Sequence, residues 1–472
     1  MKKLLIVSLV LLSLAGSTSV FAQWSSDPMM NLGIAVKPGE QVQPKIRPTA
    51  DGGCYISWFD NDPNGMPPFG YDVDLQRLDA NGVPQLGANG IRIADLGMSS
   101  TQDYGLDVDA DGNALLAFLD DRRAYNPNVT VTMIKVIPNG TQVWGRWGVA
   151  VTGSQDFLGQ PKIAATSDGF VVGAWIEGNN IKLQKLSSRF GQKLWGQNGI
   201  TITAPMGMTY SVADLHGSDN GSVIVSWVSA AGFTSPKHLM ANKIASDGSL
   251  LWGANHVAVF DGGSLQFGNF PPFVTDGAGG AVFGWYEVGP LQSRAQHILA
   301  DGSEAFPHNG VLGSTNAAHD HVNPSVSYDP LTSSTYLFWD EILEGPLTNE
   351  GISGQKFNAT GERQWGDSGL VVQPFTSSAV LNVTSVFMSA GPMVVWSSEA
   401  AFSQDVITGA KVDPNANIIC PPFPVSSILS SKSRLNLTLA TNGRALAAWS
   451  DGRADGGDIY AQDIKPDCSL GQ

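Results

Sequence analysis

The chain has 472 residues, with 42 acidic against 27 basic side chains and a formal net charge of −15 at neutral pH. Nucleic acids and anionic membranes select basic surfaces, so this excess of acid excludes both as expected partners. Beyond residue 22 no segment approaches the ~20 apolar residues of a membrane helix, and we expect no membrane insertion.

The N-terminus has the three parts of a secretory signal peptide. Met1 is followed by the basic residues Lys2 and Lys3, residues 4–14 are mostly apolar, and residues 20–22 end in alanine. We therefore predict that residues 1–22 form a signal peptide and that the mature chain begins at Gln23. The protein is expected to be exported, and to be secreted, periplasmic or associated with the cell surface.

An aromatic residue ends a short apolar run eight times along the chain. The eight positions, 52 to 60 residues apart, are Trp58, Phe118, Trp175, Trp227, Trp285, Trp339, Trp396 and Trp449. This spacing lies just above the ~40–50 residues of known propeller repeats. It predicts a repeat protein in which each repeat forms one structural unit.

Each repeat shows the same order of strand signals. The first strand starts near a proline, as in Gln43-Pro44, and we expect that proline at the first residue of the strand. A turn such as Asp51-Gly52 accepts positive φ angles and leads into the aromatic-ended second strand. After a third strand, a glycine stands four residues before another aromatic, as in Gly140 and Trp144. The pattern predicts a four-stranded antiparallel blade.

The two ends of the chain complement each other. The last repeat contains Trp449 and a third strand but ends at Gln472 without a fourth, whereas residues 23–36 form a strand with no repeat of their own. We predict that residues 23–36 pair into blade 8, about residues 430–472, and close a ring, because an open array would need capped ends. The expected fold is all-β: a single eight-bladed β-propeller over residues 23–472, acting as a monomer.

An acid stands two positions after the repeat aromatic in six of the eight repeats. These acids are Asp60, Asp120, Glu177, Glu287, Glu341 and Asp451. Connections after the second strand emerge on one face of a propeller, so the acids predict a ring of carboxylates on a loop face. One interpretation is a ligand face. The other is structural, with each acid accepting backbone N–H groups and pairing with neighbours such as Arg122, Arg123 or Arg453.

Two short segments are candidate metal sites. His319, Asp320 and His321 form the densest histidine cluster, and two imidazoles with a carboxylate suit zinc or another transition metal. Solvated loop histidines are the alternative. The run 107–112 resembles the start of a calcium loop, but its twelfth position is Phe118 instead of the required carboxylate, which favours a structural hairpin. We expect no cofactor, with zinc or calcium as the alternatives.

Export also permits disulfide bonds. Of the three cysteines, Cys420 and Cys468 both lie near the end of the repeat array and are the expected pair, with two reduced thiols as the open alternative. Cys54 lies in an apolar strand pattern and is expected to be a buried small hydrophobe.

The sequence contains no Gly-x-Ser-x-Gly elbow, no Gly-x-x-x-x-Gly-Lys phosphate loop and no His-Glu-x-x-His zinc motif. The leading hypothesis is an exported, non-catalytic propeller that binds a protein or carbohydrate partner through its acidic loop face. The alternative is an enzyme at the same face, either a polysaccharide-active lyase or hydrolase or a quinoprotein-like enzyme.

Part of each repeat resembles a known propeller motif. The segment 78–82, Leu-Asp-Ala-Asn-Gly, has counterparts that end in Trp144, Trp195, Trp252 and Trp365. It resembles the tryptophan-docking repeat of eight-bladed quinoprotein dehydrogenases and of the periplasmic propeller of the outer-membrane barrel-assembly machinery. Quinoproteins of the alcohol-dehydrogenase type carry an adjacent Cys-Cys pair, which this chain lacks. The pattern over residues 449–462 resembles repeats of large exported bacterial proteins.

Overall fold

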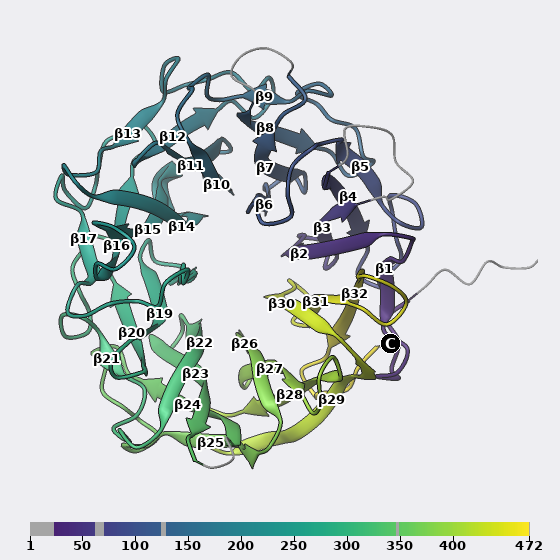
Figure 1. Ribbon diagram of the computed structural model, residues 1–472, viewed down its shortest axis with the longest axis vertical. Coiled ribbons are helices and arrows are strands. Elements are labelled where there is room, and N and C mark those ends of the chain that lie inside the picture. Colours follow the sequence, from purple (N-terminus) through teal and green to yellow (C-terminus); the bar gives the residue numbers. More distant parts are fainter. Residues whose placement is uncertain (1–22, 62–69, 124–128, 346–348, 472) are drawn as a thin grey trace, which may run out of the picture.

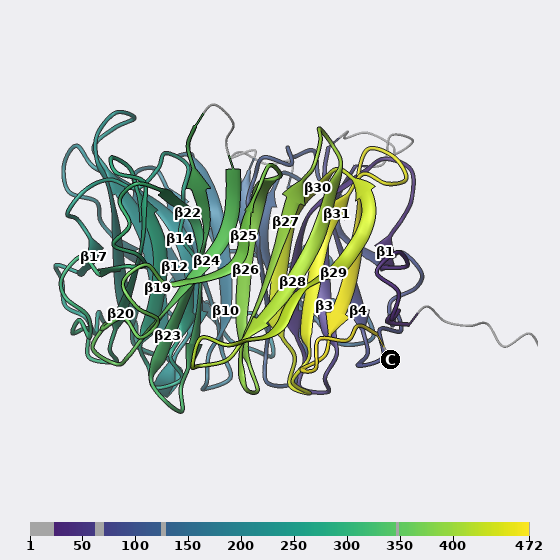
Figure 2. The same ribbon diagram turned by 90° about the horizontal axis from the view of Figure 1, so that it is seen from below.

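The computed structural model describes residues 23–61, 70–123, 129–345 and 349–471, so the predicted signal peptide at 1–22 lies outside the described residues. Its strands form eight four-stranded antiparallel sheets arranged as a ring around a central opening (Figure 1). In Figure 2 the strands run between the two faces of this ring. The predicted eight-bladed β-propeller is confirmed.

The first four blades follow the chain, and their strands are given from the central opening outwards. Blade 1 contains β2 (Glu40–Pro48), β3 (Cys54–Asn61), β4 (Asp72–Leu78) and β5 (Ile91–Ala94). Blade 2 contains β6 (Gly105–Val108), β7 (Ala114–Asp120), β8 (Thr130–Val136) and β9 (Val149–Ala150). Blade 3 contains β10 (Leu158–Ala165), β11 (Val171–Glu177), β12 (Asn180–Leu186) and β13 (Ile200–Ile202). Blade 4 contains β14 (Thr209–Gly217), β15 (Val223–Ala230), β16 (Lys237–Ile244) and β17 (Val257–Phe260).

The last four blades complete the ring. Blade 5 contains β18 (Phe273–Thr275), β19 (Ala281–Glu287), β20 (Gln292–Ile298) and β21 (Val311–Leu312). Blade 6 contains β22 (Asp320–Asp329), β23 (Ser334–Leu343), β24 (Asn349–Phe357) and β25 (Leu370–Thr376). Blade 7 contains β26 (Ala379–Met388), β27 (Gly391–Glu399), β28 (Asp405–Val412) and β29 (Ile418–Ser430). Blade 8 contains β30 (Lys432–Leu439), β31 (Ala445–Asp451), β32 (Asp458–Ile464) and β1 (Leu32–Ala35).

The hydrophobic core is divided among the blade interfaces. All eight repeat aromatics lie on second strands and are at most 2 % exposed. Eight clusters of buried side chains each combine residues from two adjacent blades. Burying one large apolar side chain stabilises a fold by about 1.5–3 kcal/mol, so each interface adds its own share of stability and the ring grows beyond the size of a single core.

A second set of aromatics joins most blades to the next one. The indole N–H groups of four tryptophans donate to a carbonyl of the following blade, over 3.1 to 3.2 Å; the pairs are Trp144–Ser188, Trp195–Ser246, Trp252–Ala300 and Trp365–Pro414. The ring also covers the turn glycine of that blade. A Cβ on Gly191, at φ +64°, would lie 2.6 Å from Val149 and 3.1 Å from the ring of Trp144. The glycine-to-aromatic pattern of the sequence is therefore a contact between blades.

The interface between blades 7 and 8 uses a disulfide at this place. Cys420 on β29 is bonded to Cys468, with the two Cα atoms 6.5 Å apart. The Cys468 N–H donates to the Lys465 carbonyl as the Gly82 N–H donates to the Asp79 carbonyl, and Cys468 has φ +70°. Cys468 therefore stands where other blades have the turn glycine. Cys54 is a buried free thiol, as expected.

The N-terminal segment closes the ring as the sequence predicted. β1 pairs antiparallel with β32, and Leu32 lies opposite Ala461. Trp24, 3 % exposed, covers Gly82 of blade 1 with its ring, and its backbone N–H donates to the Asn81 carbonyl over 3.2 Å. Trp24 thus acts as the docking tryptophan of blade 8. The only helical element in the described ranges is the short 3-10 turn η1 (Asp219–Gly221), and no helix there is long and apolar enough to cross a membrane.

Candidate functional site

The six repeated acids lie at or near the C-terminal ends of the second strands, and the blades enclose their side chains. Their side chains are at most 16 % exposed, and three of them, Asp60, Asp120 and Asp451, are fully covered. They do not form an exposed carboxylate ring in the structure.

Each of the six acids has a basic partner close by. The nearest nitrogen lies 2.6 to 3.9 Å away, in the pairs Asp60–Lys37, Asp120–Arg122, Glu177–Lys182, Glu287–Arg294, Glu341–His319 and Asp451–Arg453. Arg123 instead donates to the carbonyls of Trp147 and Gly148. These contacts are those of the structural interpretation, in which the acids hold the ends of the second strands.

Asp451 shows how such an acid stays charged in a buried position. Its carboxylate accepts hydrogen bonds from the Trp449 indole over 2.8 Å, Ser430 over 2.6 Å and Arg453 over 2.6 Å. Burial alone would raise the pKa of this carboxyl, but the hydrogen bonds and the nearby Lys432 hold the pKa below its ordinary value. The repeat tryptophan thereby also orients the acid two residues after it.

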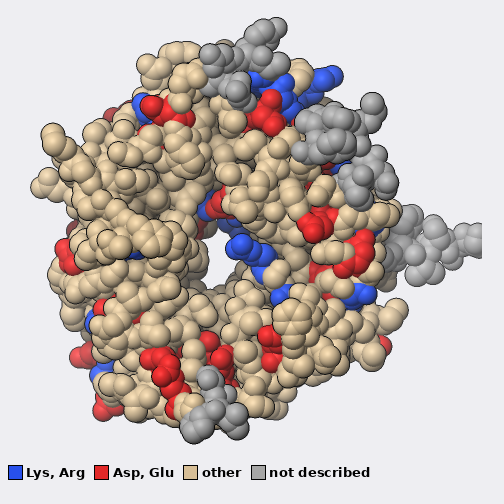
Figure 3. Space-filling view, in the orientation of Figure 1, with Lys and Arg blue, Asp and Glu red and all other residues tan. Residues whose placement is uncertain are grey.

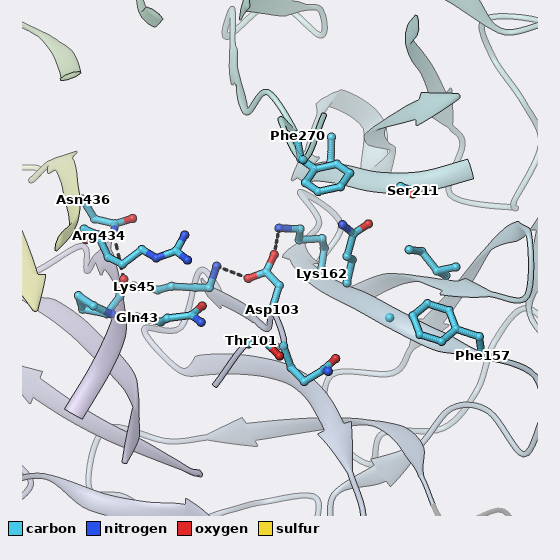
Figure 4. Close-up of a pocket in the computed structure, with 17 residues that line it drawn as sticks. Gln43, Lys45, Thr101, Asp103, Phe157, Lys162, Ser211, Phe270, Arg434 and Asn436 are labelled. Carbon is cyan, nitrogen blue, oxygen red and sulfur yellow. Dashed lines mark hydrogen bonds and ion pairs between the residues drawn. The ribbon is translucent and has the colours of Figure 1, made fainter. Parts of the chain in front are cut away.

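A pocket lies at the central opening and is built by bulges in the first strands. It has a volume of about 720 Å³ and is lined by residues of six blades. Ten of the lining residues are labelled in Figure 4. One bulge is in β2, where the register shifts between Val42 and Lys45 and Gln43 has φ +55°. Gln160 of β10 and Arg434 of β30 repeat this at φ +46° and +56°. Left-handed backbone in non-glycine residues is strained and concentrates at functional sites.

These bulges correct one detail of the sequence prediction. Pro44 and Pro161 were expected at the first residue of a strand, but they stand inside β2 and β10, directly after the left-handed residue of the bulge. A bulge is the other place where a sheet tolerates proline, because the bulged residue makes no ladder hydrogen bond. The Gln-Pro signal therefore marks the lining of the pocket.

The pocket is basic although the protein is acidic. Lys45, Lys162 and Arg434 line it, with Asp103 as the single acid. Asp103 bridges the two lysines, 2.8 Å from Lys45 and 2.5 Å from Lys162 (Figure 4). Despite its burial, these two cations hold the pKa of Asp103 well below the ordinary value. Figure 3 shows Lys and Arg side chains inside the central opening.

Polar amides and aromatic rings complete the lining. Asn436 donates to the Pro44 carbonyl over 2.9 Å, whereas the buried Oε1 of Gln160 has no hydrogen-bond partner among the described residues. Phe157 is 70 % exposed at the rim, and Phe270 also faces the pocket (Figure 4). An adjoining groove of about 300 Å³ shares Phe270 and Ser211 with the pocket, and its wall includes Phe233 and Phe267.

The structure brings the two histidines of the predicted metal cluster together with a different acid. Potential ligand atoms of His319, His321 and Glu341 lie within 4.8 Å of one another. Asp320 lies between the histidines at the start of β22, where alternation directs its side chain to the other side of the strand. Glu341, which was predicted as a member of the acid ring, therefore provides the carboxylate that the sequence analysis expected from Asp320.

The calcium-like run forms a hairpin turn. Oδ1 of Asp109 accepts hydrogen bonds from the N–H groups of Asp111 and Asn113, over 3.0 and 2.9 Å. Lys135 of β8 lies 2.7 Å from the same carboxylate. The oxygens of Asp109 are thus taken by the turn and a lysine, as in the structural interpretation of this run.

The chain is an eight-bladed β-propeller with a basic, amide-lined central pocket. No family model and no curated protein matches it, and nothing found supports the resemblance to quinoproteins or to exported repeat proteins. Solved structures with a similar fold include an ulvan lyase (9 % identity, TM-score 0.44, 86 % of this chain and 96 % of that one) and the polysaccharide lyase Uly1 (9 %, 0.41, 91 % of each chain). An arabinanase from Penicillium chrysogenum is another (10 %, 0.34, 77 % and 93 %). Scores this low carry no argument about activity.

Proposed function

We propose that this protein binds an anionic polysaccharide in its central pocket. The observation that carries the proposal is the charge of the lining, three cations against one acid in a chain of net charge −15. A concave site of one sign focuses its field on a ligand of the opposite sign. The planar guanidinium of Arg434 is suited to binding a carboxylate or a sulfate through two hydrogen bonds.

The other lining groups suit a sugar chain. Gln160 offers a buried carbonyl oxygen that lacks a partner among the described residues, and a ligand hydroxyl can donate to it. The exposed rings of Phe157 and Phe270 provide apolar faces at the rim. This proposal keeps the carbohydrate partner expected from the sequence, but moves its binding place from the acids to the basic central pocket.

Binding assays with polysaccharides of different charge test the proposal. Titration calorimetry should detect a polyuronate or a sulfated glycan but no uncharged glucan, with affinity that falls as salt is added, because salt screens the lysines and the arginine. Lys162→Gln and Arg434→Gln should each weaken binding by about three- to ten-fold, that is about 0.7–1.4 kcal/mol. Arg189→Gln, on an exposed turn of blade 3, is the matched control. Equal binding of charged and uncharged glycans, or no effect of the pocket variants, contradicts the proposal.

Lys45 supports a second candidate, a polysaccharide lyase. Burial lowers the pKa of the Lys45 ammonium, and Lys162 adds to this effect against the opposing Asp103. A lysine with a lowered pKa can act as a general base. In β-elimination it would take the C5 proton of a uronate whose carboxylate is held by Arg434. The C5–H electron pair would form the C4=C5 double bond, and the bond from C4 to the glycosidic oxygen would break. That oxygen would leave with the bonding pair and take a proton from the newly protonated Lys45 or from water.

The two candidates differ in their products. A lyase releases an unsaturated uronate with strong ultraviolet absorbance, and Lys45→Met should abolish that signal while weakening polysaccharide binding no more than Lys162→Gln does. If the wild-type protein binds the polysaccharide but releases no unsaturated product, the protein is a binder and the lyase candidate fails.

The proposal includes export, since polysaccharides of this kind are found outside the cytoplasm. The basic residues Lys2 and Lys3, followed by the mostly apolar residues 4–14, support a signal peptide. Fractionation of the producing cells, followed by N-terminal sequencing, should find a mature chain outside the cytoplasm that begins at Gln23. A chain that keeps Met1 and stays in the cytoplasm contradicts it.

A further inference from the structure

Three donor side chains meet where the first strand of blade 6 begins and its second strand ends. His319 precedes β22, His321 is its second residue, and Glu341 lies opposite His321 on β23. Oε1 of Glu341 is 2.6 Å from Nδ1 of His319 and 3.7 Å from Nε2 of His321. The backbone pairing of two strands therefore holds the three groups close together, and none of them belongs to the central pocket.

One donor atom in this cluster has no partner. His321 is 1 % exposed, and its Nε2 makes no hydrogen bond to any described residue. An unpaired buried nitrogen is costly unless something binds it. It lies 3.7 Å from Oε1 of Glu341, and the groups of this cluster are of the kinds that can bind a metal ion.

The neighbouring blade determines which nitrogen of His321 carries the proton. Gln292 of β20 donates through Nε2 to the His319 carbonyl over 2.9 Å, which orients its Oε1 towards Nδ1 of His321 at 2.7 Å. An amide oxygen only accepts, so Nδ1 carries a proton, and in the neutral imidazole the lone pair that can bind a metal ion is then on Nε2. Metal-binding histidines are commonly oriented in this way by an acceptor at the other ring nitrogen.

We propose that His319, His321 and Glu341 bind a divalent transition metal ion, with zinc as the expected metal and Gln292 as a positioning residue. Two histidines and one glutamate are an established donor set for zinc, with ligand distances near 2.0–2.2 Å. Metal binding replaces the hydrogen bond between His319 and Glu341. The His319 side chain is 20 % exposed, which leaves the fourth coordination position to water or a ligand oxygen.

The corresponding place in blade 1 shows that the blade does not need these histidines. Gln41 pairs with Asp60 in the β2–β3 ladder as His321 pairs with Glu341, and the Gln41 amide donates to Asp60 over 3.0 Å. In blade 1 an amide, together with the cations Lys37 and Arg92, thus partners the acid without any histidine. Blade 6 departs from the repeat by placing two imidazoles beside its acid, as expected of a specific site.

Zinc titration of the chelator-treated full-length chain tests the proposal. Calorimetry and elemental analysis after gel filtration should find one zinc bound per chain, and zinc should raise the melting temperature, since a ligand of the folded state stabilises it. His321→Gln, which copies blade 1, and Glu341→Gln should each lose the bound zinc. Gln292→Ala should weaken zinc binding by about 10- to 100-fold. His308→Gln, outside the cluster, is the matched control and should bind as the wild type does.

Two further measurements keep the result interpretable. Circular dichroism in chelator confirms that each variant is folded, and His319→Gln, which changes the most exposed ligand, replaces His321→Gln if the latter does not fold. Cobalt should give the visible spectrum of a four- or five-coordinate site in the wild type and not in these variants. If the wild type retains no zinc after gel filtration, or if the cluster variants retain as much as His308→Gln, the proposal is wrong.

Discussion

At the scale of single residues, the repeated acids are the parts of this protein whose role depends most on burial. A carboxylate at the surface gains little from one nearby cation. When the same carboxylate is enclosed by a blade, every group that donates to it depends on it, because those donors cannot form hydrogen bonds with water instead. Asp451 and Glu177 occupy equivalent positions, and Glu177, 16 % exposed, is closer to the surface case than Asp451, which is fully covered.

Asp451→Asn should destabilise the protein strongly. The change removes the charge that compensates Arg453 and Lys432, which are 13 % and 1 % exposed, and breaking a buried pair costs about 3–5 kcal/mol. Urea denaturation gives the free energy of unfolding. Glu177→Gln is the control, because that pair is longer at 3.9 Å and more exposed, and its loss should cost less than about 1 kcal/mol. Equal effects of the two substitutions argue against a special role of burial.

Asp72 should make the stability of the protein depend on pH. Burial raises its pKa to about 7 and the neighbouring Asp95 and Asp74 add to this, although the Leu96 N–H and Arg92 oppose it. A raised pKa in the folded state means that the stabilising contribution of Asp72 is fully present below its ordinary pKa of 3.8 and is lost as the pH rises through about 7.

Asp72→Asn keeps an oxygen that can accept from the Leu96 N–H, but it has no titrating proton. The free energy of unfolding of the wild type should therefore fall relative to that of the variant between about pH 4 and pH 7, and the difference should level off above pH 7. Denaturation curves of both proteins across this range provide the measurement. A constant difference between the two proteins would show that the pKa of Asp72 is not raised.

At the scale of elements, each blade is attached to the next by one repeated contact. The turn between the third and fourth strands of a blade presents a residue with positive φ, and the preceding blade covers it, usually with an aromatic ring and at Gly140 with the side chains of Leu86 and Ile91. Between blades 7 and 8 the bond between Cys420 and Cys468 takes over this contact. The pairing of β28 with β29 has four register shifts, and β29 contains three prolines, which cannot donate ladder hydrogen bonds.

Removing the disulfide should weaken the interface between blades 7 and 8. Cys420→Ser combined with Cys468→Ser should lower the free energy of unfolding by about 2–4 kcal/mol, because the open chain has more freedom when unfolded. A reductant should have the same effect on the wild type and none on the double variant. Identical denaturation of wild type with and without reductant would show that the bond contributes nothing.

Sequence patterns predicted these elements well wherever the signal is local. Asp-Gly and Asn-Gly turns and the glycine before Trp144 depend on the backbone of a few consecutive residues, and these were placed correctly. The repeat aromatics lie on the second strands as predicted, but the strands continue two to four residues beyond them. The pattern did not show that Trp144 contacts Ser188 of the next blade. It also placed Pro44 at a strand start, since a bulge and a strand start tolerate proline for the same reason.

At the scale of the whole molecule, ring closure depends on fourteen residues at the N-terminus, 23–36. This segment supplies β1 to blade 8 and covers blade 1 with Trp24. Asn31 also donates to the Val425 carbonyl of blade 7 over 2.9 Å. One short segment therefore contacts three blades and joins the two ends of the ring.

Deleting residues 23–36 should reduce the cooperativity and the temperature of unfolding. Without β1 the edge of β32 is exposed and promotes aggregation, and the cover of Gly82 is lost. Scanning calorimetry and light scattering measure both effects. Trp24→Ala is the matched variant, because it keeps β1 and should cost only about 3–5 kcal/mol. A deleted chain that melts like the mature protein would show that the ring does not need this closure.

The sequence by itself determined the number of blades, their four strands and the closure by residues 23–36, because these follow from patterns within one repeat and from their count. The tertiary structure decided the candidate sites. Lys45, Asp103 and Lys162 come from three blades, and Glu341 follows His321 by twenty positions, so only the bulges and the strand register bring them together. Whether an acid faces solvent or is enclosed likewise depends on side chains that pack against it from distant parts of the chain.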